Sequence, residues 1–244
     1  MNAGWYNSSV AQTGESSSLD PSRRAEADVP SKGAPAWYER LGDLPGGRFR
    51  VRCLIGGDHP DGTVVANPRS TAGLFELWRA DLDAEGRPTI WVNPMAVPGA
   101  PELWFVALRE AGPPPAMSLV GFEVPAVPAG TVVSDAAFFS LPVRNVDQAA
   151  AIRWWPDEAV VDQVYVGDAY RRRHAATLMI YAASAFHQLH GWPNRLHSDG
   201  RRTAMGQQLV AGLRHPARIA PLEHLMAPMD DHREPRGSRR PSAD

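Results

Sequence analysis

The chain has 244 residues, of which 43% are hydrophobic and 21% charged, and its formal net charge is −2; this composition is typical of a globular protein and excludes an intrinsically disordered one. It contains no run of 18 apolar residues, which excludes a membrane-spanning helix, and its first residues lack the basic start and apolar core of a secretory signal. The single cysteine, Cys53, excludes an internal disulfide and a cysteine-based metal site, so we expect a cytoplasmic protein.

The two ends of the chain differ in character from the middle. Residues 1–34 are rich in Ser, Ala, Asp, Glu and Pro, residues 228–244 are similarly polar, and neither segment shows an apolar period. Such segments bury too little apolar surface to offset the entropy of ordering. We therefore predict two disordered tails around one domain, residues 35–227.

The first half of the domain favours strands. Residues 49–56, with Arg48 just before them, alternate apolar side chains with arginines, as a half-buried strand does. Residues 74–82 and 88–94 flank an Asp-Ala-Glu-Gly sequence at 83–86, which predicts a hairpin loop. Residues 102–110 and 132–141 are further strand candidates, although the second is rich in alanine and is also compatible with a helix.

The second half changes to an alternation of strands and helices. Residues 160–166 are β-branched and aromatic and predict a strand. A helix follows, with apolar residues on one face and Gly191 and Pro193 beyond its end. The segment 195–198 predicts a short strand and 203–213 a second helix. This order is typical of an α/β unit with parallel strands.

Positive charge gathers in the same region. Residues 35–161 carry 10 Arg against 15 Asp and Glu, whereas residues 162–218 carry 8 Arg against 3 Asp. The turn at 171–176, Arg-Arg-Arg-His-Ala-Ala, joins the strand to the helix, where free backbone N–H groups and the helix dipole favour an anion. The sequence predicts a pyrophosphate site here; the alternative is a solvated basic helix start. We expect no nucleic-acid surface, because the basic segment is compact.

Residues 161–192 (VDQVYVGDAYRRRHAATLMIYAASAFHQLHGW) resemble the central motif of the GNAT acyltransferase superfamily. In that family a strand leads into an Arg/Gln-x-x-Gly-x-Gly/Ala turn, which corresponds here to Arg171-x-x-His174-x-Ala176, with matches at Arg171 and Ala176. The resemblance covers roughly residues 155–214. It implies an α/β (α+β) fold with a mixed central sheet flanked by helices, here with a strand-rich N-terminal half.

The high ratio of arginine to lysine is typical of GC-rich bacterial genomes.

The resemblance also implies a function and a site. The chain would transfer an acetyl or other acyl group from acetyl-CoA or another acyl-CoA to an amine of a small molecule or peptide, without a metal. The turn would hold the pyrophosphate, the sheet would splay to admit the pantetheine arm, and amides of the strand 162–166 would polarise the thioester carbonyl. The implied cofactor-binding residues are Val164, Val166, Arg171, Arg172, Arg173, His174, Ala175 and Ala176.

Catalytic residues are less clearly marked. Asp162 lies where relatives often carry an acidic general base, and the alternative is an exposed or capping carboxylate. Ser198 lies at the end of the predicted strand 195–198, where α/β folds gather ligand contacts, and the alternative is a plain turn with a helix cap. His187 and His190 are three residues apart on one helix, but no third metal ligand is evident at a recognisable spacing, so we expect no metal site.

Two departures from the family pattern support a different function. His174 replaces the first glycine of the turn, and Gln208 stands where many relatives have a tyrosine that protonates the departing thiolate. A degenerate GNAT-like binding or interaction module without acyl transfer is therefore the main alternative. An enzyme that uses an acyl carrier protein or an aminoacyl donor is another. The segment after Gly212 does not predict the two strands that usually shape the acceptor site, so that pocket would come from the N-terminal part or be incomplete. The oligomeric state stays open, with a homodimer among the alternatives.

Overall fold

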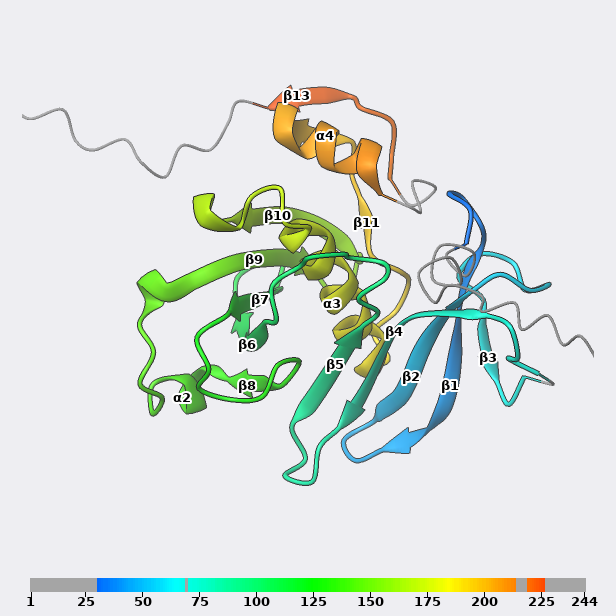
Figure 1. Cartoon of the computed structure of the whole chain (residues 1–244), viewed down its shortest axis with the longest axis horizontal. Helices are drawn as coiled ribbons and strands as arrows, with labels where there is room; N and C mark the ends of the chain where they lie inside the picture. The colour runs from blue at the N-terminus through cyan, green and yellow to red at the C-terminus, as the bar shows by residue number, and fades with distance from the viewer. Residues whose placement is uncertain (1–29, 69, 214–218, 227–244) are drawn as a thin grey trace, which may run out of the picture.

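A five-stranded sheet forms the N-terminal half of the structure, a computed structural model that describes residues 30–68, 70–213 and 219–226 (Figure 1). Its strands are β1 (Ala36–Leu44), β2 (Arg48–Ile55), β3 (Val64–Ala66), β4 (Phe75–Leu82) and β5 (Pro88–Val92), in the order β3-β1-β2-β4-β5. Neighbours are antiparallel except β3, which is parallel to β1. We call this sheet A.

The hairpin between β4 and β5 confirms the loop predicted at 83–86. The carboxylate of Asp83 accepts hydrogen bonds from the backbone N–H groups of Glu85 and Arg87, at 3.0 and 2.8 Å. β1 was not predicted, because its first four residues are all buried and show no alternation of apolar and polar side chains.

A second, six-stranded sheet, sheet B, follows in the chain. Its order is β11-β10-β9-β7-β6-β8, and β6, β7, β9 and β10 are antiparallel neighbours. β8 is parallel to β6 at one edge and β11 is parallel to β10 at the other, which confirms the predicted parallel pair. The bounds are Trp104–Glu110 for β6, Ala116–Phe122 for β7, Val132–Ser134 for β8, Gln148–Trp155 for β9, Val160–Val166 for β10 and His197–Ser198 for β11.

The helix α3 (Ala175–Leu189) lies between the two sheets (Figure 1). It packs against β2, β4 and β5 of sheet A and against β9 and β10 of sheet B. Alanines at 182, 183 and 185 are completely buried and let both sheets approach the helix closely, while Met179 and Phe186 fill the remaining space. The predicted helix is confirmed. The larger hydrophobic core runs through sheet A, α3 and sheet B, and a smaller one is formed by Trp104, Val106, Phe122 and Val133.

Smaller elements complete the fold. The segment 132–141 is strand β8 followed by the short helix α2 (Asp135–Phe138), so both of its expected conformations occur. The predicted second helix is α4 (Ala204–Gly212). Thr203 caps its start, because the Thr203 hydroxyl accepts a hydrogen bond from the N–H of Gly206. β12 (Arg201–Thr203) pairs in parallel with β13 (His224–Met226), beside α4 (Figure 1).

The mixed α/β class with a strand-rich first half is thus confirmed. The predicted tails fall outside the described residues, except for residues 30–34. Within the described part of the chain, no helix is long and apolar enough to cross a membrane.

Candidate functional site

The candidate site is centred on the turn between β10 and α3. The chain leaves β10 at Val166, makes a short 3-10 turn at Asp168–Tyr170, and enters α3 after His174. Arg172 and His174 both have positive φ, 61° and 54°, a left-handed conformation that glycine adopts most readily. The family-like turn therefore places a left-handed residue at 174, where the family pattern has glycine, although the residue itself is His.

The start of α3 presents free backbone donors. Leu178 is the first residue whose N–H bonds to the helix, at 2.9 Å from the carbonyl oxygen of His174. The N–H groups of Ala175, Ala176 and Thr177 precede it and have no intrahelical acceptor. His174 makes no side-chain capping bond, and its side chain is exposed. The positive end of the helix dipole is thus left open to a ligand.

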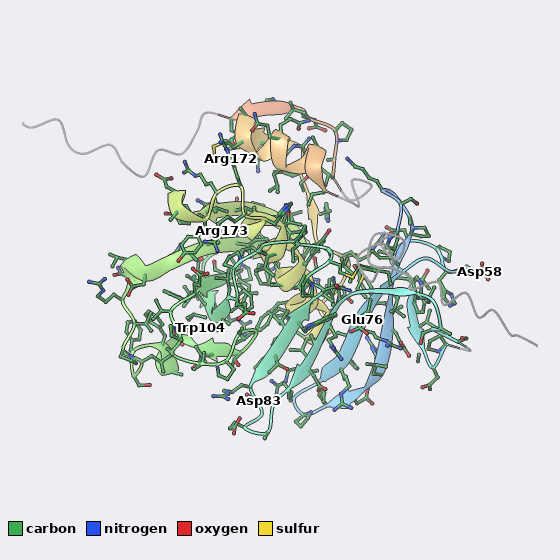
Figure 2. The ribbon with its side chains drawn as sticks, viewed as in Figure 1. Asp58, Glu76, Asp83, Trp104, Arg172 and Arg173 are labelled. Atoms are coloured by element: carbon green, nitrogen blue, oxygen red, sulfur yellow. The ribbon has the colours of Figure 1, made fainter. Side chains whose placement is uncertain are left out.

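The three arginines of the turn do not converge. Arg171 forms an ion pair with Asp168 at 2.8 Å. Arg173 forms one with Glu123 at 3.5 Å and lies 5.6 Å from the ring centre of Tyr170. Arg172 is exposed and lies nearer to α4 than Arg173 does (Figure 2). The backbone donors of the turn therefore lie close together, whereas the guanidinium groups of the three arginines point in different directions.

Strand β11 covers only the first part of one edge of β10. Its two residues pair with Val160 and Val161 and the strand then ends at Ser198. On its other side β10 has an irregularity between Val161 and Gln163 that breaks its register with β9. A cavity of about 300 Å³ lies along β10 beyond the short pairing.

The cavity joins several of the predicted residues. Val164 and Val166 line it from β10, and Ala176 lines it from the start of α3. Asp162 and Ser198 line it at the end of the β10–β11 pairing. α4 covers it on one side. Sheet A also contributes, through Ala36, Leu77 and Trp78, a contribution from the N-terminal half that only the tertiary structure identifies.

Asp162 is engaged by a basic residue. Its carboxylate forms an ion pair with Arg153 on β9. The same guanidinium binds Glu110 at 3.0 Å, and this hydrogen bond lowers the pKa of Glu110 below its usual value. Asp162 therefore lies at the cavity but shares its cation with a second carboxylate.

Ser198 is held by Arg202. Its hydroxyl accepts a hydrogen bond from Nη1 of Arg202 at 3.0 Å, and the same nitrogen donates to the carbonyl oxygen of Ala220 at 2.9 Å. The neighbouring His197 ring lies 3.1 Å from the carbonyl oxygen of Arg195 instead of contacting the serine. The serine is thus arranged as an anchor for the Arg202 guanidinium rather than as a nucleophile with an adjacent base.

His187 and His190 take part in packing. Nε2 of His187 lies 2.9 Å from the carbonyl oxygen of Pro193, and Nδ1 of His190 lies 2.9 Å from that of Phe186. The His190 ring stacks on Trp192, with ring centres 4.6 Å apart. Burial lowers the pKa of both histidines below the usual value. Across residues 30–68, 70–213 and 219–226, no three metal-ligating side chains come together.

A second hollow, of about 370 Å³, lies near the opposite side of the turn. Arg173 and Glu123 line it together with Trp104, which is labelled in Figure 2. Tyr170 lies beside Glu123, and burial, with a contribution from that carboxylate, raises the pKa of its phenol. No local sequence signal marks this hollow, because loops far apart in the chain form it.

Comparison with known proteins adds no relative. No family model, curated protein or solved structure matches the chain. Function therefore has to be inferred from the uncapped helix start and the cavity along β10.

Proposed function

We propose that the chain is an acyl-CoA-dependent N-acyltransferase similar to the GNAT superfamily, which moves an acetyl or other acyl group to the amine of a small molecule or peptide. One observation carries the proposal: a cavity lies along β10 beyond its short pairing with β11 and reaches the uncapped start of α3. Backbone donors at a helix start suit a pyrophosphate. A cavity that runs along the strand from these donors suits the pantetheine arm of the same molecule.

The backbone of the turn gives further support. A glycine in the family's turn allows a left-handed conformation, and His174 has this conformation with φ of 54° and ψ of 12°. Histidine is among the non-glycine residues enriched there. His174 thus differs from the family pattern in its side chain, which is exposed and does not line the cavity, while its backbone follows the pattern.

The proposed reaction needs little covalent chemistry from the protein. A neutral amine attacks the thioester carbonyl, the C–N bond forms, the C–S bond breaks and CoA leaves as a thiol after gaining a proton. Backbone N–H groups of β10 along the cavity would stabilise the oxyanion. Holding amine and thioester together supplies much of the remaining rate.

Two observations favour the alternative of a binding module without acyl transfer. Asp162 is ion-paired with Arg153, which opposes its acting as a general base because the cation stabilises the carboxylate. Gln208 is exposed and does not line the cavity, so no acid stands at that position to protonate the thiolate. In this alternative the same site binds CoA or a related anion without turnover.

The test combines binding and turnover on the full chain. Calorimetric titration with CoA and acetyl-CoA measures binding, and a thiol-reactive dye measures CoA release in the presence of a panel of amines. Replacing Arg171 and Arg172 together by Ala should weaken binding about three- to thirtyfold, because each charge near the dipole contributes about 0.3–1 kcal/mol. The matched control is Arg50→Ala, which removes an equally exposed arginine from sheet A.

Each outcome has a distinct meaning. Binding with amine-dependent thiol release supports the acyltransferase. Binding without release under any amine supports the module. If neither CoA nor acetyl-CoA binds, the proposed function is wrong.

A further inference from the structure

The cavity has two chemically different ends. Beside the short pairing of β10 with β11, its wall is polar, with Asp162, Ser198 and Arg202. Towards sheet A the wall is apolar, and Leu77, Trp78 and Leu213 contribute side chains to it. A ligand that fills the cavity must therefore carry a polar part at one end and an apolar part at the other.

The side chains at the apolar end are themselves almost fully buried. Leu77 is 2% exposed, Trp78 is 1% exposed and Leu213 is 6% exposed, although all three line the cavity. Partly buried α4 residues, Leu209 and Val210, cover the same space. Water in such a space finds few polar partners, and its replacement by an apolar group is favourable.

A stripe along α3 connects this end to the helix start. Ala176, Ile180 and Ser184 all line the cavity and follow one another at intervals of four residues. Eight residues of helix rise about 12 Å, so the cavity extends well past the first turn of α3. Ser184 is 8% exposed and marks the inner end of the stripe.

The distribution of charged residues around the cavity favours an uncharged group at its apolar end. Asp162 is the single carboxylate among the residues described as lining the cavity, and it is paired with Arg153 at the polar end. A cationic amine would lose its hydration at the apolar end without gaining a counter-ion, which is costly. An acyl chain has no charge to desolvate.

We propose that the apolar end of the cavity takes the acyl chain of the donor, and that the preferred donor is a medium-chain acyl-CoA of about eight carbons in place of acetyl-CoA. This inference rests on the proposed function. Leu209 and Ser184 are then specificity-determining residues, the first as an apolar contact of the chain and the second as the small residue that leaves room for it.

The experiment is a binding series with CoA, acetyl-CoA, butyryl-CoA and octanoyl-CoA on the full chain. Each buried methylene strengthens binding up to about fourfold, and we expect octanoyl-CoA to bind at least about 30-fold more tightly than acetyl-CoA. Leu209→Ala should weaken octanoyl-CoA binding about fivefold more than it weakens CoA binding. The matched control is Leu222→Ala, because Leu222 is 43% exposed and does not line the cavity.

Ser184→Leu provides an opposite test by filling the inner end. It should abolish the preference for octanoyl-CoA while acetyl-CoA still binds, and its melting curve shows whether the protein remains folded. If CoA binds but octanoyl-CoA binds no more tightly than acetyl-CoA, the acyl-chain inference is wrong and the proposed function stands. A preference for octanoyl-CoA that neither Leu209→Ala nor Ser184→Leu changes would also overturn it. If no CoA derivative binds, the proposed function itself fails.

Discussion

His174 should be a site where glycine stabilises the protein. The residue precedes α3 with φ of 54°, makes no side-chain capping bond and is exposed. A left-handed backbone costs a non-glycine residue about 1–2 kcal/mol, and the usual opposing cost of glycine is about 0.4–1 kcal/mol of extra entropy in the unfolded chain. His174→Gly should therefore raise the free energy of unfolding by about 0.5–1 kcal/mol.

The assay is thermal and urea denaturation of the wild type and a series at this position. For a chain of this size, the gain corresponds to a rise in Tm of about 1–4 °C. His174→Val should lower the stability by about 1 kcal/mol or more, because a β-branched residue is strained in the left-handed region. CoA affinity should stay the same or improve in His174→Gly, since the side chain does not line the cavity.

The matched control is His197→Gly. His197 is also an exposed histidine, but it lies in strand β11 without a positive φ. Glycine there should cost about 0.5–1 kcal/mol. If His174→Gly destabilises the protein as much as His197→Gly does, the backbone at 174 is not left-handed. A large loss of CoA affinity in His174→Gly would make the imidazole a direct contact of the ligand.

Three further predictions concern stability. Burial lowers the pKa of His187 and His190 in the folded protein, so below the ordinary histidine pKa of about 6.5 the unfolded chain binds more protons than the folded chain. The free energy of unfolding should therefore fall as the pH falls below that value, and urea titrations at pH 7.5 and 5.5 test this. Arg153→Met removes the cation that pairs with Glu110 and Asp162 and should lower the free energy of unfolding in urea by about 1 kcal/mol or less, because these ion pairs are partly exposed. An unchanged free energy of unfolding would show that the two ion pairs contribute nothing to stability. Gly130→Ala should cost about 2–4 kcal/mol in the same assay, because a Cβ there collides with the backbone of β5. Gly86→Ala, where a Cβ meets open space, should cost about 1 kcal/mol. Equal costs would refute the steric argument.

The apolar periodicity revealed the elements that have one buried face or a clear turn. The β4–β5 hairpin follows from alternation and from Asp83, whose carboxylate binds the backbone of its own loop. The helix α3 follows from its apolar spacing and from the Gly191 and Pro193 that end it. β7 and β9 were missed, because β7 is buried along most of its length and β9 is rich in alanine, so that neither has the strict period of a half-buried strand.

The candidate site divides in the same way. The turn 171–176 is a local feature, and a basic strand-to-helix turn was recognisable from adjacent residues. The ion pairs of the site were not recognisable in this way. Arg173 pairs with Glu123, fifty positions earlier in the chain, and Asp162 pairs with Arg153 on the neighbouring strand. Ion pairs of this kind depend on which strands become neighbours, and a single sequence does not contain that information in any local pattern.

The sequence by itself determined the class of fold, the strand–turn–helix unit and the small residues that open α3, because backbone conformation, helix ends and amphipathic faces depend on residues within a few positions of one another. Only the tertiary structure decided that α3 lies between two sheets and that sheet A closes the cavity with Leu77 and Trp78. Burying both sides of an alanine-rich helix requires partners from distant parts of the chain. The same packing that completes the core therefore also sets the shape and the apolar character of the cavity.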